Sequence, residues 1–377
     1  MADHAATEQR TMLADSVADY CRRSDPVARL RGLRDSATGF DRAAWTEMAE
    51  LGWMGVIVPE AHGGLGLSIG DYAIVARGAA AALVPEPLTA AMVATAAIAE
   101  SGNETLKADL LPRIVSGELI PALAWQETIG DIDSAQIAAT IAVDGARAAL
   151  SGRKRFVIGG AGADGYVVSA RDADGPALYW VPATSAGLRL TPQRLADGRP
   201  VIDLVLDAAP VSGAQRLASG ESALRALSVA VDHGNFAISA ELLGLSQRAL
   251  DMTLDYLRTR TQFSKPIGAF QSLQHRAVDL YIHQRIGEAT FDHALRMSEA
   301  SDDPQLRSAS ASRAKARSAE TARRITREAI QMHGAIGFTD DCDVGLYVKR
   351  ALVLSAWLGN ASLHRRRYAA LTPLEVE

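Results

Sequence analysis

The sequence predicts a multidomain α+β protein with an N-terminal helical domain, a middle β-sandwich or β-barrel domain and a C-terminal helical bundle. Apolar residues follow helical spacing with loop breaks up to residue 118, and alternate with a period of about two from residue 119 to 213. After that they return to helical spacing in long stretches poor in proline. We therefore expect domains at residues 1–118, 119–213 and 214–377.

The N-terminal region predicts short helices separated by glycine. Residues 43–51 (AAWTEMAEL) carry apolar side chains at helical spacing, and residues 63–66 (GGLG) break the chain before a second helix begins. The apolar residues 78–84 end at Pro85 and are far fewer than the roughly 18 that a membrane span needs. We interpret them as the end of a helix.

The middle region predicts β-strands. Turns such as Asp144-Gly145 and Asp197-Gly198 separate its alternating segments. Those segments read IAATIAV, GYVVSAR, ALYWVPA and VIDLVLD.

The C-terminal region predicts long helices packed as a bundle. It is rich in alanine, leucine and arginine, and one set of apolar side chains repeats at the helical period along a single face. That set is Phe236, Leu243, Leu250, Leu254 and Leu257.

Composition excludes several classes of protein. The 377 residues are 48% hydrophobic, and 39 basic against 44 acidic residues leave a net charge of −5, so no basic field for nucleic acid exists. Cys21 and Cys342 lie far apart, and the eight histidines show no ligand spacing, so we predict no disulfide framework and no metal. Without a leader or a membrane span, we expect a cytoplasmic protein.

Residues 256–280 (YLRTRTQFSKPIGAFQSLQHRAVDL) carry the most information about chemistry. A long helix runs into a Pro-Ile-Gly turn before a second helix begins, which gathers Arg260, Phe263, Phe270 and Gln271 around the turn. A guanidinium and free N–H groups at a helix start suit an anion. The alternative is a helical hairpin in which Arg260 pairs with a carboxylate.

A second block, residues 331–339 (QMHGAIGFT), follows a helix and holds Gly334 and Gly337. Glycine permits left-handed backbone and close approach of a ligand, so a phosphate or adenine fits against this turn. The alternative is an ordinary glycine cap at the end of a helix.

Both blocks resemble signatures of the acyl-CoA dehydrogenase family. The first matches Arg-x-x-Phe followed by Pro-Ile-x-x-Phe-Gln-x-x-x-His, with Ser264 where glycine is usual. The second resembles Gln-x-x-Gly-Gly-x-Gly-Phe-Thr, and residues 50–68 and 111–125 also resemble family text. The resemblance implies two sets of residues that contact FAD. Those of the first block would contact the FAD of a neighbouring subunit; they are Arg260, Gln262, Phe263, Phe270 and Gln271. Those of the second block are Gln331, Gly334, Ala335 and Gly337.

The resemblance implies a fold and a reaction. The fold would be that of acyl-CoA dehydrogenases, with a C-terminal four-helix bundle. The reaction would be FAD-dependent α,β-dehydrogenation of an acyl-CoA thioester to the trans-2-enoyl-CoA, with an electron-transfer flavoprotein as electron acceptor. An acyl-CoA oxidase-like flavoenzyme on the same fold is an alternative.

The catalytic base departs from the family pattern. The reaction needs a carboxylate in a dry pocket to remove the α proton. The family's usual base is the Glu of Tyr-Glu-Gly-Thr, but the matching text here is Trp357-Leu358-Gly359-Asn360. Some members carry the base on the helix before the first block, where Glu241 is the only acid within residues 233–250, amid small and apolar neighbours. We predict Glu241 as the base; the alternatives are that it faces solvent or a partner, or pairs with an arginine of another helix.

The flavin-facing segments depart from the family as well. Residues 126–133 (QETIGDID) stand where many members carry Thr-Glu-Pro-Gly-Ala-Gly-Ser-Asp, and only Glu127 matches. Phe156 and Ile158 replace a Trp and a Thr beside the flavin, so stacking by Phe156 is kept while a hydrogen bond is lost.

These departures resemble two-component family members of lipid or steroid catabolism, in which unlike subunits share FAD and substrate sites. They include small subunits for pimeloyl-CoA or steroid-derived CoA esters. We therefore expect a sister subunit, as in a heterotetramer, with a homo-oligomer or a non-catalytic subunit as alternatives. Small residues beside Glu241 suggest room for a bulky acyl group; they are Ala237, Ser239, Ala240 and Gly244.

Overall fold

The structure is a computed structural model that describes residues 2–128, 130, 132, 136–144 and 147–373. It contains two compact units. The first unit comprises residues 1–26, 73–84 and 235–377, and the second comprises residues 27–72 and 85–234. The predicted division into three domains remains a prediction.

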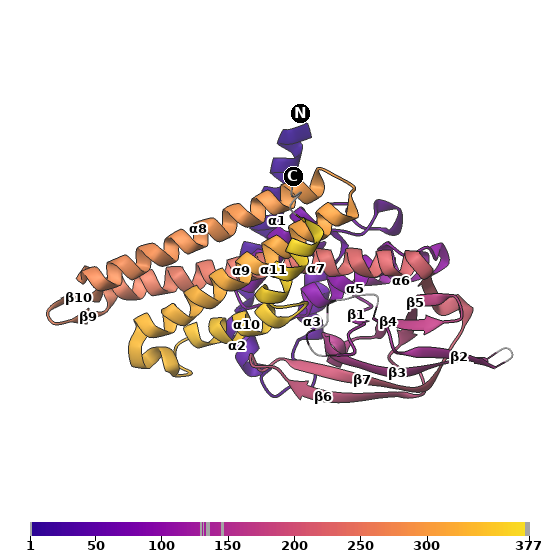
Figure 1. The fold of residues 1–377 in the computed structure, drawn as a ribbon. Helices are drawn as coiled ribbons and strands as arrows, with labels where there is room; N and C mark the ends of the chain where they lie inside the picture. The colour runs from indigo at the N-terminus through magenta and orange to yellow at the C-terminus, as the bar shows by residue number, and fades with distance from the viewer. Residues whose placement is uncertain (1, 129, 131, 133–135, 145–146, 374–377) are drawn as a thin grey trace. The chain divides into compact units, whose positions relative to one another are not determined.

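The second unit is built on one eight-stranded sheet (Figure 1). Its order is β6-β7-β3-β2-β4-β5-β8, with β1 parallel to β4. The four alternating segments of the sequence fall in β2, β4, β5 and β7, so the β prediction is confirmed. The strands are β1 (Pro121–Ala124), β2 (Thr140–Asp144), β3 (Arg147–Ile158), β4 (Gly165–Asp172), β5 (Gly175–Pro182), β6 (Leu188–Arg194), β7 (Pro200–Val211) and β8 (Arg216–Ser219).

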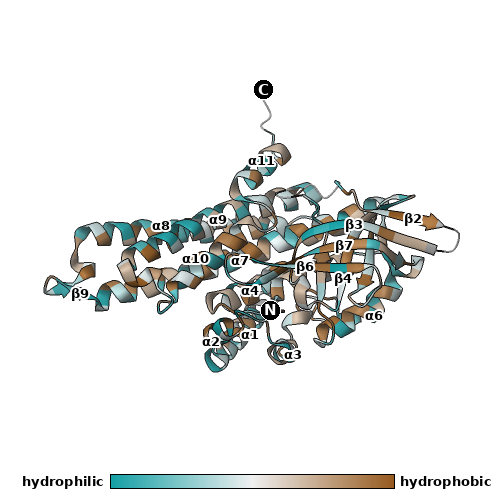
Figure 2. Cartoon of the chain, turned by 90° about the horizontal axis from the view of Figure 1, so that it is seen from below, coloured by the Kyte–Doolittle hydropathy of each residue, from teal (hydrophilic) through white to brown (hydrophobic). Residues whose placement is uncertain are grey.

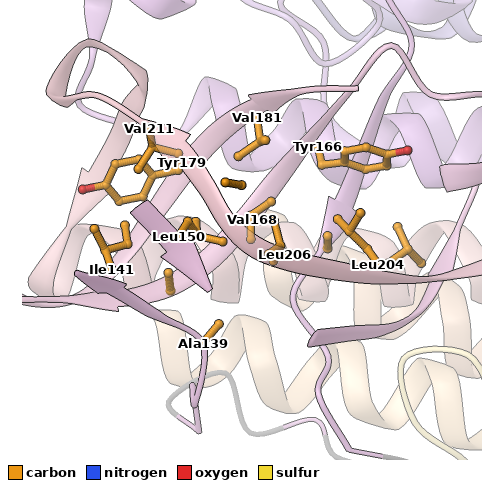
Figure 3. Close-up of a cluster of buried hydrophobic side chains, with 14 of the residues drawn as sticks. Ala139, Ile141, Leu150, Tyr166, Val168, Tyr179, Val181, Leu204, Leu206 and Val211 are labelled. Atoms are coloured by element: carbon orange, nitrogen blue, oxygen red, sulfur yellow. The ribbon is translucent and has the colours of Figure 1, made fainter. Parts of the chain in front are cut away.

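Side chains from one set of alternating strand positions fill the core of this sheet. Figure 3 shows Tyr166, Val168, Tyr179 and Leu204 among them, all buried. Such burial of alternate residues is what holds the register of each strand, because a slip by one residue would expose the whole apolar set. The helices of this unit are α2 (Pro26–Gly32), α3 (Arg42–Glu50), α5 (Leu88–Ala99) and α6 (Glu104–Val115).

Helix α5 explains how the sheet is covered. Every residue from Leu88 to Ile98 is buried, which fits a helix that is apolar on all sides. It contacts β1 and β4, and a Cβ on Gly159 would lie 2.9 Å from the Cβ of Ala90. Small side chains therefore let this helix approach the sheet closely.

Long helices make up the first unit, as the sequence predicts. The helices α4 (Ile69–Ala81) and α7 (Gly220–Thr259) each contribute residues to both units, and α7 is 40 residues long. The others are α1 (Ala2–Ser24), α8 (Gln271–Glu299), α9 (Pro304–His333), α10 (Val344–Ala356) and α11 (Ala361–Leu371).

Close helix packing in this unit depends on small residues. A Cβ on Gly287 of α8 would lie 2.9 Å from Thr321 Oγ1 of α9 and 3.0 Å from a methyl of Leu243 of α7. Phe236 of α7 packs edge-on against Phe291 of α8, with ring centroids 6.5 Å apart. The predicted helical bundle is therefore confirmed. Among the described residues, no helix is long and apolar enough to cross a membrane.

Candidate functional site

The first signature block forms a hairpin between α7 and α8. Strands β9 (Thr261–Gln262) and β10 (Lys265–Pro266) are joined by Phe263 and Ser264, whose φ values are +53° and +63°. Positive φ at both central residues is the geometry of a tight two-residue hairpin turn, for which glycine is favoured. Ser264, where the family pattern has glycine, adopts this conformation at the cost of some strain.

The side chains of this hairpin are presented outwards. Phe263 is 86% exposed and meets Phe270 edge-on, with centroids 6.1 Å apart, while Lys265 Nζ lies 4.2 Å from the centre of the Phe270 ring. Arg260 and Gln271 are also exposed. No carboxylate pairs with Arg260 in the part of the chain that the structure describes, so the alternative of an internal ion pair is not found there.

The second block lies against the first. Tyr256, near the end of α7, stacks on His333 at the end of α9, with centroids 4.5 Å apart. The short helix η6 (Gly334–Phe338) follows. Gly334 caps α9 through its N–H to Gln331 O, so the structure shows the helix-cap role that the sequence left open.

Glycine is required for a different structural reason at each of the two glycine positions of this turn. Gly334 adopts φ +66° and ψ −142°, a region essentially restricted to glycine, and nothing lies within 4 Å of a Cβ placed there. A Cβ on Gly337 would lie 2.7 Å from Ile330 O, so only glycine lets η6 pack on α9. Ala335 is exposed. The turn thus leaves open space beside Gly334.

The donors at this end of the first unit fit a dinucleotide. A guanidinium without a carboxylate partner and the amides of Gln271 and Gln331, all exposed, suit a pyrophosphate. The exposed rings of Phe263 and Phe338 suit a purine. Gln262 is exposed too, with its amide on Thr261 O at 2.8 Å.

Glu241 is buried on α7, 5% exposed. Arg350 Nη2 of α10 donates to Glu241 Oε2 at 2.9 Å, and the arginine is buried as well. Glu241 Oε1 has no hydrogen-bond partner among the described residues. Of the three alternatives to a base, the structure therefore shows the ion pair with an arginine of another helix.

The surroundings of Glu241 are tightly packed. Ala237 and Ala240 are buried, and Ser239 Oγ donates to Asn235 O at 2.6 Å. A Cβ on Gly244 would lie 2.2 Å from the carbonyl oxygen of Arg77 on α4. The expectation that Gly244 leaves room for an acyl group is therefore wrong, because this glycine lets two helix backbones approach.

The structure does not bring Glu241 and Arg260 together. Glu241 lies within the continuous helix α7, which ends at Thr259, and Arg260 is the first residue after this helix. Eighteen residues separate Glu241 from Thr259, or roughly 27 Å at 1.5 Å per residue. The carboxylate and the hairpin of one chain thus cannot surround the same small group.

The turn at residues 357–360 occupies the position of the family's usual base. Leu358 is buried with φ +55°. Lys315 Nζ of α9 donates to Trp357 O at 2.8 Å and to Gly359 O at 2.7 Å, and His364 Nε2 of α11 donates to Leu358 O at 2.8 Å. Three consecutive carbonyls are therefore satisfied by two buried side chains.

Burial shifts the pKa of both donors. It lowers the pKa of Lys315 to about 7, and it lowers the pKa of His364 to about 3, with the charge of Lys315 adding to the effect. Sequence reasoning missed both residues. The available signal was a lysine within the small-residue run SASASRAKARSA, a pattern typical of a buried helix face.

Phe156 lies in the second unit, at a bulge of β3 where the register with β7 shifts between Lys154 and Val157. Its φ is +52°, its N–H donates to Asp203 Oδ1 at 3.2 Å, and Arg155 lies 5.2 Å from its ring centre. Non-glycine residues held at positive φ often mark functional sites. Phe156 is one of seven non-glycine residues with positive φ among the described residues, and its place beside a flavin stays a prediction.

Asp203 fixes this bulge. Burial alone would raise the pKa of its carboxyl, but the hydrogen bonds from Arg153 and from the Phe156 N–H, with the charges of Arg153 and Arg155, lower it overall. Arg153 Nη2 donates to Asp203 Oδ2 at 2.6 Å. The carboxylate therefore stays ionised and holds the backbone of Phe156.

Glu127 links residues 138 and 139 to β3. It accepts hydrogen bonds from the N–H groups of Ala138 at 2.7 Å and Ala139 at 3.0 Å, and from the buried Lys154. Of the 126–133 segment, Ile129, Asp131 and Asp133 lie outside the described residues, as does Gly145 of the Asp144-Gly145 turn.

Comparison with known proteins decides the family. The model of the acyl-CoA dehydrogenase N-terminal domain matches residues 7–118, and that of the C-terminal domain matches residues 224–371. Acyl-CoA dehydrogenase FadE27 of Mycobacterium tuberculosis is 30% identical over 338 residues, covering 87% of each chain. The chain belongs to the acyl-CoA dehydrogenase family. It is accordingly an FAD-dependent dehydrogenase of acyl-CoA thioesters.

Solved structures of this family share the fold over the whole chain. A variant of the Tcur3481-Tcur3483 steroid ACAD has a TM-score of 0.86 and 30% identity, with 98% of each chain covered. The ChsE4-ChsE5 complex of Mycobacterium tuberculosis has a TM-score of 0.85 and 27% identity, also with 98% of each covered. The prediction of the acyl-CoA dehydrogenase fold is confirmed. Among the described residues no group of histidine, cysteine, aspartate or glutamate side chains could hold a metal.

Proposed function

We propose that this acyl-CoA dehydrogenase is one subunit of a heteromeric enzyme and that its hairpin and glycine turn complete the FAD site of a neighbouring subunit. The observation that carries the proposal is the set of donors and rings around Arg260 and Phe263, which are exposed rather than buried within their own unit. The separation of roughly 27 Å along α7 from Glu241 supports it further.

In this proposal each predicted residue has a role toward the cofactor. Arg260 would neutralise the pyrophosphate, Gln271 and Gln331 would donate to its oxygens, and Phe263 would cover the adenine. Phe156 of the second unit would pack beside a flavin. Bound FAD supplies the acceptor for the hydride that leaves the β carbon of the substrate.

Glu241 is the proposed base. Its Oε1, free of protein donors among the described residues, would take the proton from the α carbon, while the hydrogen bond from Arg350 to Oε2 fixes the orientation of the carboxylate. Burial keeps water from this group, which strengthens its interactions with a bound thioester.

A second candidate is that this subunit of the dehydrogenase supplies no base of its own and completes the cofactor site of a catalytic sister. Two observations favour it. Arg350 already satisfies one oxygen of Glu241, as in a structural ion pair, and the turn at residues 357–360 holds Leu358 in place of a carboxylate. Here the base would belong to the partner.

The proposed substrate is a CoA ester with a bulky, steroid-derived acyl group. The support is the description of one similar structure as a steroid acyl-CoA dehydrogenase. The description of another similar structure as a complex of ChsE4 and ChsE5 supports the heteromeric assembly. An electron-transfer flavoprotein is the proposed electron acceptor, following the family resemblance.

The test is to purify the chain with and without the product of its neighbouring gene and to record the flavin spectrum during anaerobic addition of acyl-CoAs. We expect a colourless chain alone and a yellow complex that bleaches with a steroid-derived thioester. A chain that is yellow and bleaches alone would overturn the heteromeric proposal.

The Glu241→Gln variant of the complex then separates the two candidate functions, with the exposed Glu221→Gln on the same helix as its control. If Glu241 is the base, flavin absorbance stays while bleaching slows by at least about a hundredfold. Unchanged bleaching would assign the base to the partner.

A further inference from the structure

A cavity lies between α9 and α11 of the first unit, two helices that pack against each other (Figure 1). Its volume is about 230 Å³, nearly eight times the roughly 30 Å³ that one water takes in the liquid. It is open to solvent. Its lining residues are Ser312, Arg313, Ala316, Arg317, Glu320, His364, Arg365 and Tyr368.

Positive charge dominates this cavity. Three of the lining side chains are arginines, and the single acid, Glu320, forms an ion pair with Arg365. Arg313 and Arg317 have no carboxylate partner in the described part of the chain. They stand four residues apart on α9, a spacing that puts both guanidinium groups on one face.

The two unpaired arginines are only partly satisfied as donors. Arg313 Nη2 contacts His293 Nδ1 at 2.7 Å, and Arg317 Nη2 contacts His283 Nδ1 at 3.1 Å. The Nε–H groups of both arginines are buried, and neither has an acceptor among the described residues. An anion with several oxygens would supply acceptors to the guanidinium groups that line the open cavity.

The side chains next to Arg313 and Arg317 that are described below carry no negative charge to offset the positive charge of the two guanidinium groups. Burial lowers the pKa of Arg317, and the nearby Arg324 lowers it further. His364 on the opposite wall is neutral, since burial and Lys315 hold its pKa at about 3. Arg367 adds a further guanidinium, whose Nη1 donates to Ser312 Oγ at 3.1 Å.

We propose that the cavity between α9 and α11 binds a phosphate-bearing small molecule through Arg313 and Arg317. Planar guanidinium groups match phosphate oxygens in pairs, and the small side chain of Ala316 leaves space for them. The volume admits more than a bare ion, so the ligand is a diphosphate or an organic phosphate. This site is separate from the residues proposed to contact FAD.

Calorimetric titration of the full chain with inorganic pyrophosphate tests the proposal. We expect saturable binding of one pyrophosphate, weakened at least about tenfold when Arg313→Gln is combined with Arg317→Gln. Arg323→Gln is the matched control, because this arginine is exposed on the same helix but outside the cavity. Arg260→Gln should also retain the binding, which separates the cavity from the proposed FAD site.

Ala316→Leu provides a second variant that changes no charge. Filling the cavity with three carbons should weaken pyrophosphate binding to a similar degree, and the far-ultraviolet circular dichroism spectrum of each variant checks that it folds. Absence of binding to the wild-type chain, or equal binding by wild type and both cavity variants, would overturn the proposal. Adenosine diphosphate and succinate, titrated in parallel, distinguish an organic phosphate from a carboxylate ligand, and tighter binding of succinate than of either phosphate would also contradict it.

Discussion

Lys315 illustrates how a single buried group can make stability depend on pH. Its amine is fully enclosed, yet a neutral amine still has two N–H bonds, which matches the two carbonyls it reaches in the 357–360 turn. The structure thus favours the deprotonated form, and this agrees with a pKa lowered to about 7.

The free energy of unfolding should therefore rise with pH between about 7 and 10.5, because only the unfolded chain still binds this proton there. The contribution of Lys315 to the slope is at most about 1.4 kcal/mol per pH unit. We expect Lys315→Met to remove it, so that the difference from wild type widens from pH 7 to pH 9.5 in urea unfolding. Lys349→Met, at a position of α10 outside the buried face, should leave the slope unchanged; an unaltered slope in Lys315→Met would contradict the expectation.

Individual residues also show what the sequence could and could not reveal. The Arg260 and Gly334 blocks stand out because their residue types and spacings are local. The ion pair between Glu241 and Arg350 joins residues 109 positions apart, and no spacing predicts it. Lys315 and His364 likewise meet only through the packing of α9 and α11.

At the scale of elements, the partly buried Glu127 and the buried Lys154 form an ion pair that ties residues 138 and 139 to β3. Lys154 also donates to Ser169 Oγ at 2.9 Å, so removing Glu127 would leave an enclosed ammonium without a counter-charge. We expect Glu127→Gln to lower the free energy of unfolding by about 3 kcal/mol. Combining it with Lys154→Met should recover part of the loss, as a double-mutant cycle in urea would show. Additive losses would mean that the two side chains act independently.

The glycine turn after α9 offers a sharper comparison. Gly334→Ala forces a Cβ into a backbone conformation that only glycine tolerates well, at about 1–3 kcal/mol of strain, although no neighbour obstructs it. We expect the turn to rearrange and FAD affinity of the assembled enzyme to fall. Ala335→Gly restores the family pattern without strain and should keep that affinity, measured by flavin fluorescence. Equal affinities in both variants would separate this turn from the cofactor.

Strands were predictable from sequence where they carry a clear run of apolar residues. Strands β4 and β5 have mostly buried residues, and β2 and β7 also carry clear alternating segments. Strand β6 lies at an edge of the sheet, carries Pro192 and is exposed along almost its whole length, so no apolar pattern marks it. Strand β1 is only four residues long.

At the scale of the whole molecule, one face of α8 carries exposed apolar side chains. Brown turns interrupt the teal of α8 in Figure 2, and four large apolar side chains recur at helical spacing while remaining about half exposed. They are Val278, Tyr281, Ile282 and Ile286. Helix α8 begins next to the hairpin that is proposed to contact the FAD of a neighbouring subunit. An apolar stripe along this helix therefore lies where a subunit interface is expected.

We expect Ile282→Asp to reduce the mass of the assembled protein, measured by light scattering after gel filtration, because a charge would be buried in the contact. Circular dichroism should stay unchanged, since the side chain is exposed in the single chain. Glu299→Lys, at the exposed end of the same helix, is the control. An unchanged mass for Ile282→Asp would exclude this stripe from the interface.

The hairpin at Phe263 has a consequence for a chain that has not yet found its neighbour. An aromatic residue that stands almost entirely in solvent, on a two-residue turn between very short strands, is an accessible cleavage point for a chymotrypsin-like protease. Once a neighbouring subunit and cofactor cover that turn, the same bond would be shielded. An orphaned subunit would thus be destroyed before an assembled one, so the segment that completes the enzyme would also keep the two subunits in balance.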